Sequence, residues 1–136
     1  MSRLAIVATG LLVLAAAALG PFALRSAAQA RIQAAVRHVV VFKFKPEATP
    51  AQIQQVTDAF RTLATTIPGV TAFEDGVNNS PEKKNLGFTH AFLITFESAA
   101  ARDAYLPHPA HKKFGELLGS LQVMEDVFVV DYEPAK

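Results

Sequence analysis

The sequence contains no cysteine. This absence excludes a disulfide framework, a thiol nucleophile, thiolate metal ligands and lipidation of an N-terminal cysteine. The sequence also lacks a phosphate-cradling glycine loop, a dinucleotide-binding fingerprint and a local motif for a Ser/His/Asp triad. Stability must therefore come from an apolar core and from any partner subunit.

Neither sign of charge is in large excess, because 13 lysines and arginines face 12 aspartates and glutamates. The sequence has no basic block interleaved with aromatic residues that could follow a phosphate backbone, so we expect no nucleic-acid partner. The 136 residues, 51% of them hydrophobic, suffice for one compact domain and a short extension.

The extension is at the N-terminus, where residues 4–24 carry no charge and follow Arg3. The small residues of Ala28-Gln29-Ala30 match a processing site, so residues 1–30 are predicted to be a signal peptide whose cleavage leaves Arg31 first. The alternative is an uncleaved anchor helix, because about 20 apolar residues span a bilayer. We expect the domain to be secreted or periplasmic, or anchored to a membrane through this segment alone with the domain outside the cytoplasm.

The remaining chain, residues 36–133, alternates strand and helix signals in the order βαββαβ. Thr49, Pro50 and Gln52 form a helix start, and an apolar stripe continues to the Pro68-Gly69 stop. The second helix is predicted from the Ser98 cap, is interrupted by prolines, resumes at residue 109 and stops at Gly119. The predicted strands are residues 37–45, 70–77, 88–97 and 123–132. This order is typical of the α+β ferredoxin-like fold.

The predicted strands are apolar on both faces. In the first strand, His38, Val40 and Phe42 lie on one face, whereas Val39 and Val41 lie on the other. The third strand is predicted to place Phe88, His90, Phe92, Ile94 and Phe96 together on one face. Because helices cover only one side of such a sheet, we expect a second subunit to cover the other side in a two-fold homodimer that forms a barrel.

Histidines and a tyrosine are the residues that could carry chemistry. His38, Tyr105, His108 and His111 suggest proton transfer, because histidine titrates near neutrality and a tyrosine hydroxyl can donate to developing charge on oxygen. The helix start after the two prolines could also favour an anionic oxygen. The alternative is structural: such histidines often cap helices or pack in cores, and His90 fits that interpretation best.

A metal site would need His108 and His111 with an acid such as Asp131. Pro109 favours a position for His108 outside the helix, which makes convergent ligation doubtful. We therefore expect no metal and no cofactor.

Four segments resemble the stress-responsive dimeric α/β-barrel (Dabb) family: residues 38–45, 67–70, 105–111 and 129–132. The resemblance implies a ferredoxin-like subunit and a dimeric barrel. Similarity to a polyketide cyclase of the family implies that His111 removes a proton and Tyr105 stabilises the enolate, while His38 lies in the active site and Asp131 orients an imidazole. The residues expected to contact the substrate are Val40, Phe42, Val56, Phe60, His108 and Phe114.

The sequence thus predicts an exported Dabb-type homodimer that binds a small hydrophobic molecule. Proton transfer of the cyclase, lyase or isomerase kind is one expectation for this molecule. A non-enzymatic structural or stress-protective envelope dimer and a cofactor-free, monooxygenase-like dimeric barrel are the alternatives.

Overall fold

The computed structural model describes residues 34–135, and the predicted signal peptide or anchor lies outside the described residues. The elements in chain order are β1 (Val36–Phe44), α2 (Pro50–Thr66), β2 (Val70–Val77), β3 (His90–Phe96), α3 (Ala99–Tyr105), α4 (Pro109–Leu121) and β4 (Met124–Tyr132). Across residues 34–135, no helix combines the length and the hydrophobicity that crossing a membrane requires.

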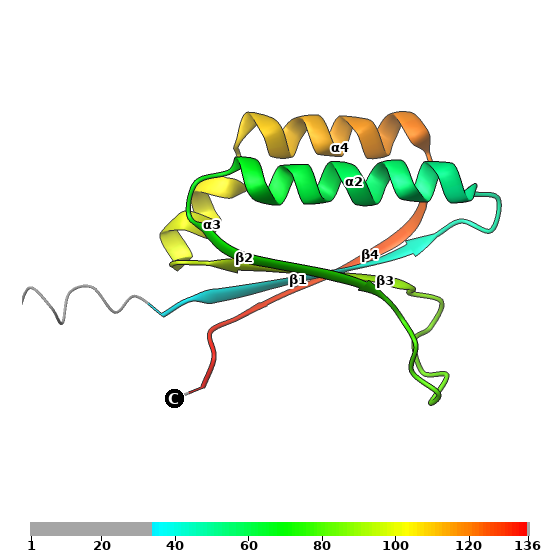
Figure 1. Ribbon diagram of the computed structural model, residues 1–136, viewed down its shortest axis with the longest axis horizontal. Coiled ribbons are helices and arrows are strands. Elements are labelled where there is room, and N and C mark those ends of the chain that lie inside the picture. Colours follow the sequence, from blue (N-terminus) through cyan, green and yellow to red (C-terminus); the bar gives the residue numbers. More distant parts are fainter. Residues whose placement is uncertain (1–33, 136) are drawn as a thin grey trace, which may run out of the picture. The chain divides into compact units, whose positions relative to one another are not determined.

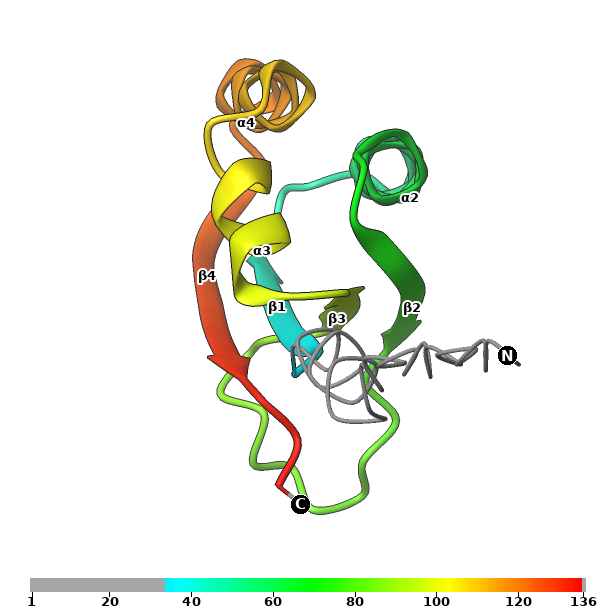
Figure 2. The ribbon, with the colours of Figure 1, turned by 90° about the vertical axis from the view of Figure 1, so that its left-hand side faces the viewer.

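The four strands form one antiparallel sheet in the order β2-β3-β1-β4. Helices α2 and α4 lie side by side over one face of this sheet (Figures 1 and 2), and among residues 34–135 no helix lies on the other face. The arrangement confirms the predicted α+β ferredoxin-like subunit.

Helix α2 begins as the sequence predicts. The Thr49 hydroxyl accepts a hydrogen bond from the Gln52 amide at 3.3 Å, and the Gln52 side chain accepts one from the Thr49 amide at 3.0 Å. This capping box satisfies two backbone donors at the helix start. After the helix ends, Gly69 adopts a φ of +84°, and a Cβ there would lie 2.6 Å from the Cβ of Ala101. Only glycine fits this turn against α3.

The core is built from stacked phenylalanine rings between the helices and the sheet. The ring centroids of Phe60 and Phe92 lie 4.4 Å apart, and those of Phe42 and Phe92 lie 5.1 Å apart. All three side chains are buried. Burying each such side chain stabilises the fold by about 1.5–3 kcal/mol, so this cluster holds α2 on the sheet.

The face of the sheet without helices is apolar, as predicted. Val39 and Val41 are half-buried on it, and the register of β4 adds Val130 and Phe128 beside them. Phe128 is 51% exposed and Val130 is 42% exposed. We call this surface the uncovered face.

Two predictions about local structure were wrong. Helix α4 does not stop at Gly119 but continues to Leu121, because Gln122 takes the left-handed conformation at φ 51° and its amide donates to the Leu118 carbonyl. Phe88 does not share a face with His90. The regular strand begins only at His90, and a positive φ of 88° at Gly87 turns Phe88 onto the uncovered face.

Candidate active site

The pairing of β1 with β4 places His38 directly opposite Asp131. The Nδ1 atom of His38 lies 2.6 Å from an oxygen of Asp131. Because a carboxylate only accepts hydrogen bonds, the imidazole donates from Nδ1, and its Nε2 remains unprotonated in the neutral ring. The second oxygen of Asp131 accepts a hydrogen bond from the guanidinium of Arg102 in α3. Arg102 and Asp131 thereby fix the orientation of His38.

Tyr105 ends helix α3 and lies between two histidines. Its ring centroid is 5.6 Å from that of His38 and 4.4 Å from that of His111. The ring is only 1% exposed and packs against Phe96 at 5.1 Å. The phenol is therefore fixed in an almost dry environment.

His111 lies in the first turn of α4, and its Nδ1 is 3.0 Å from the carbonyl oxygen of Leu106. A carbonyl cannot donate, so Nδ1 carries the proton. In the neutral ring the other nitrogen, Nε2, is then a free acceptor. This tautomer suits a general base.

These three rings border one cavity of about 240 Å³, which we call the helix-side cavity. Its remaining walls are mostly apolar and come from β1, β4, α2 and α4. The lining residues besides the three rings are Val40, Phe42, Phe60, Leu106, Phe114, Gly115, Leu118, Val127 and Val129. The structure thus brings His38, Tyr105 and His111 together with four of the residues expected to contact a substrate.

Two predicted contact residues are absent from this lining. Val56 is fully buried in the hydrophobic core. His108 is the N-cap of α4, where its Nδ1 accepts a hydrogen bond from the Ala110 amide at 3.2 Å. His108 thereby satisfies one of the backbone amides at the start of α4, where an anionic oxygen was expected to bind.

His90 lies apart from the cavity, as the structural interpretation predicted. Its ring packs edge-on against Phe44 at 5.0 Å, and its Nδ1 is 2.9 Å from the Thr89 hydroxyl. Burial lowers the pKa of His90, and the charge of Asp75 opposes this shift.

Arg102 is a site residue that sequence reasoning missed. It precedes Tyr105 by three residues, so the two share a helix face, and this spacing was the available signal. Its contact with Asp131 joins residues 29 apart in the chain. That contact follows only from the tertiary fold, which brings α3 within reach of the end of β4.

Within residues 34–135, no three histidine, aspartate or glutamate side chains are grouped as metal ligands.

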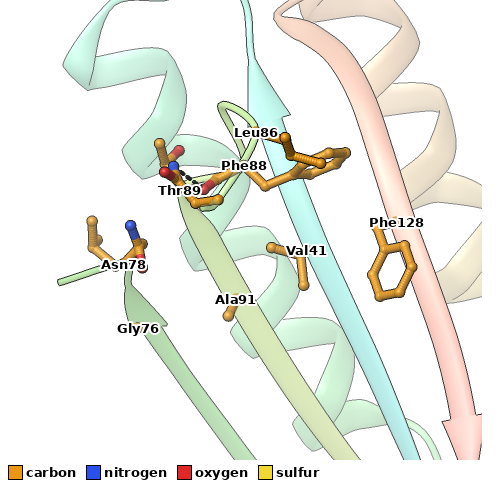
Figure 3. Close-up of a pocket in the computed structure, with 10 residues that line it drawn as sticks. Val41, Gly76, Asn78, Leu86, Phe88, Thr89, Ala91 and Phe128 are labelled. Carbon is orange, nitrogen blue, oxygen red and sulfur yellow. Dashed lines mark hydrogen bonds between the residues drawn. The ribbon is translucent and has the colours of Figure 1, made fainter. Parts of the chain in front are cut away.

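A larger cavity, about 490 Å³, lies on the uncovered face beneath the loop between β2 and β3. Figure 3 shows Val41, Ala91 and Phe128 on three strands, with Leu86 and Phe88 of the loop above them. No acidic or basic side chain is among its lining residues. Of these two cavities, the smaller helix-side cavity is the one that titratable side chains line.

The pKa of Tyr105 tests whether its ring lies in the almost dry environment described above. Burial, and secondarily the negative charge of Asp131, raise the pKa of Tyr105 above its usual value of 10.0. The sequence holds two tyrosines, so an ultraviolet titration of the Tyr132→Phe variant reports on Tyr105 alone. We expect its pKa to lie above that of a free phenol.

The free energy of unfolding of the domain should depend on the ionisation of Tyr105 at alkaline pH. Above about pH 10 the unfolded chain loses the phenol proton while the folded chain keeps it, so the Tyr105 contribution to stability is lost as the pH rises. Tyr105→Phe should lose less stability than the parent over this range in urea unfolding. A Tyr105 phenol that ionises at or below pH 10 would contradict the dry environment.

Comparisons with known proteins agree with this architecture. The family model described as the stress responsive A/B barrel domain (Dabb) matches residues 36–134. Olivetolic acid cyclase of Cannabis sativa is 35% identical over 102 residues, which cover 75% of this chain and 99% of the cyclase.

Solved structures show the same fold. The hydroxynitrile lyase from Passiflora edulis superimposes with a TM-score of 0.68 and 26% identity, covering 76% of this chain and 95% of the lyase. A dimeric ferredoxin-like protein of unknown function from Jannaschia sp. CCS1 superimposes with a TM-score of 0.62 and 31% identity, covering 74% and 99%. The family model spans nearly all of the folded region, and the chain therefore belongs to the stress-responsive A/B barrel domain (Dabb) family.

Proposed function

We propose that the helix-side cavity binds a small hydrophobic carbonyl compound and catalyses proton transfer at the carbon next to the carbonyl. The observation that carries this proposal is the convergence of Tyr105 and His111, whose ring centroids lie 4.4 Å apart in an otherwise mostly apolar cavity. A base beside an oxyanion donor is the pair that enolate formation requires.

In the proposed reaction, Nε2 of His111 takes a proton from the carbon next to the carbonyl. The electron pair of the broken C–H bond forms the C=C bond of the enolate, and negative charge develops on the oxygen. The Tyr105 hydroxyl donates a hydrogen bond to this oxygen. A phenol with its usual pKa near 10 is protonated at neutral pH, and burial raises the pKa of Tyr105 further, so the hydroxyl remains a donor.

His38 has a positioning role in this proposal. The Arg102 and Asp131 contacts hold its ring edge-on to Tyr105 at 5.6 Å. The phenol ring is thereby confined between His38 and His111. The apolar walls exclude water, which strengthens the hydrogen bond to the developing charge.

Two similar proteins support this class of chemistry. One is named as a cyclase and the other as a hydroxynitrile lyase. A ring closure and a lyase reaction can both be assisted by an acid–base pair beside a carbonyl oxygen. The proposal for this chain is restricted to the shared step, proton transfer.

The proposal is tested by deuterium exchange into simple methyl ketones in heavy water, followed by proton NMR. The parent domain should accelerate exchange at the carbons beside the carbonyl. His111→Ala should lower the rate about 100-fold to 10,000-fold, as expected for loss of a general base. Tyr105→Phe, which keeps the buried ring, should lower it about 100-fold to 1,000-fold.

His90→Ala is the matched control, because it removes an imidazole that lies outside the helix-side cavity. This variant should exchange ketone protons at nearly the parent rate. Undiminished exchange in His111→Ala, or no exchange by the parent domain, would refute the catalytic roles. A cavity that binds ketones without exchange would instead favour the non-enzymatic stress-protective dimer.

We further infer that the uncovered face forms a homodimer interface. Half-exposed Phe128 and Val130 lie there beside half-buried Val39 and Val41, and large exposed apolar patches are rare in monomers. The similar Jannaschia protein is described as dimeric and ferredoxin-like. Two copies packed through this face would bury it in a two-fold, self-complementary contact.

Adjacent residues of β4 give a matched test of the dimer. Phe128 and Val129 are each 51% exposed, but Phe128 lies on the uncovered face and Val129 lines the helix-side cavity. In analytical ultracentrifugation Phe128→Asp should be a folded monomer, because a buried unpaired charge is costly. Val129→Asp should remain a dimer. A parent domain that is monomeric at micromolar concentration would contradict this interface.

Export is also proposed, on the N-terminal sequence pattern alone. The signal peptide or anchor of residues 1–30 would place the binding domain outside the cytoplasm. A ligand would then have to come from the envelope or the surroundings of the cell.

A further inference from the structure

The larger cavity of about 490 Å³ on the uncovered face has no part in the proposed chemistry. We call it the loop-side cavity. Its floor lies at one rung of the sheet, where the strand registers align Gly76, Ala91, Val41 and Phe128 across the four strands. The side chains of this rung become larger from β2 to β4, because glycine has none and alanine has a single methyl group. The rung is therefore hollow at the β2 edge.

Neither the backbone nor the packing of the described residues requires the glycine of this rung. A Cβ added at Gly76 would meet no atom within 4 Å, and the residue lacks the positive φ that favours glycine. Glycine weakens a strand interior and often marks a place where a ligand or another backbone approaches closely. A side chain at this position would project into the loop-side cavity, which Gly76 lines. The glycine thus keeps the hollow open.

The roof of the cavity is the loop between β2 and β3, which its own hydrogen bonds hold in place. The side-chain amide of Asn85 donates to the Phe88 carbonyl at 2.8 Å, and the Phe88 amide donates to the Asn85 carbonyl at 2.8 Å. Leu86 takes a positive φ of 51°, which is unfavourable for a bulky residue, and its side chain lies above the hollow although it is 80% exposed (Figure 3). A roof that is already ordered lowers the entropic cost of binding a ligand.

The lining of the loop-side cavity contains polar groups but no charged side chain. Two asparagines in it each use one end of the side-chain amide: Asn78 accepts from the Ser80 amide, and Asn85 donates to the Phe88 carbonyl. Within residues 34–135, no hydrogen bond uses the side-chain nitrogen of Asn78 or the side-chain oxygen of Asn85. One donor and one acceptor therefore remain for a ligand. The cavity volume also lies within the roughly 300–1,000 Å³ that is typical of small-molecule sites.

We propose that the loop-side cavity is a second ligand site, for a small, neutral and mainly apolar molecule that carries one alcohol or carboxamide group. Such a group both donates and accepts hydrogen bonds, which matches the side chains of Asn78 and Asn85. A charged ligand would meet no opposite charge in the lining, so the loss of its hydration would not be compensated. The inference rests on the proposed dimer in one respect, because the second subunit covers the hollow and excludes water from it.

Hexanamide is the probe, and hexanoate and hexylammonium are charged controls of the same chain length. Binding is followed through the NMR shifts of the Ala91 methyl group and the Gly76 amide in the parent protein, which separates this site from the helix-side cavity. Hexanamide should shift both signals. The two charged controls should bind at least roughly tenfold more weakly, because no counter-charge lies in the cavity.

Two substitutions fill the hollow from different strands. Gly76→Val should abolish the hexanamide shift at Ala91, and Ala91→Val should abolish the shift at Gly76. Ala72→Val is the matched control, because Ala72 is exposed on the same face of β2 but does not line the cavity, and it should bind hexanamide like the parent. Gly76→Val and Ala91→Val should remain dimers, since they fill a space that the partner subunit leaves empty. A monomeric product of either change would show that partner side chains occupy the hollow and would overturn the proposal.

The effect on dimerisation differs in sign between a bound ligand and a partner side chain in the hollow. A molecule enclosed between the subunits binds the dimer more tightly than the monomer, so saturating hexanamide should lower the dissociation constant of the dimer in analytical ultracentrifugation. An unchanged or raised dissociation constant would overturn the enclosed site, and so would the absence of shifts at Ala91 and Gly76. Shifts at Ala91 in a parent protein that stays monomeric would refute the proposed dimer and support a ligand site that needs no second subunit.

Discussion

The site depends on one cross-strand pair, His38 with Asp131, held at 2.6 Å by the register of β1 and β4. A slip of one residue would send both side chains to the opposite face of the sheet. Arg102 of α3 is the third member, because its guanidinium donates a hydrogen bond to the second oxygen of Asp131. The last turn of α3, and with it Tyr105, is thereby tied to β4, which pairs with the strand that carries His38. The positions of His38 and Tyr105 thus depend on the strand register.

Holding Asp131, His38 and Arg102 together in a partly buried site costs free energy. Partly buried ionic groups lose hydration free energy, and their mutual attraction offsets this loss only where the geometry is good and several hydrogen bonds form. Asp131 meets that condition by contacting both an imidazole and a guanidinium. The phenylalanine cluster of the core provides stability without such compensation. Residues of both groups line the helix-side cavity: Phe42 and Phe60 come from the phenylalanine cluster, and His38 comes from the charged group.

Much of the fold was predictable because its signals are local. The Thr49–Gln52 capping box, the turn at Gly69 and the alternation of β1 each follow from a few adjacent residues. The convergence of His38, Tyr105 and His111 was reached through family resemblance, since spacing alone left a structural role open. Arg102 was missed because its partner comes from a distant strand.

Other features also required the tertiary structure. His108 was expected at the pocket but caps α4, and Phe88 turns to the uncovered face through the positive φ of Gly87. The extent of α4 was also misjudged, because Gly119 was predicted to stop the helix. The structure shows the helix continuing through Gly119 to Leu121.

The central claim is that the helix-side cavity presents an unprotonated imidazole nitrogen beside a neutral phenol. Long-range proton–nitrogen NMR correlations of the histidine rings measure the tautomer directly. At a pH where the rings are neutral, the account predicts that His38 and His111 both carry their proton on Nδ1, donated to Asp131 and to the Leu106 carbonyl. A proton on Nε2 of neutral His111 would contradict it, because the cavity would then face a donor in place of a base.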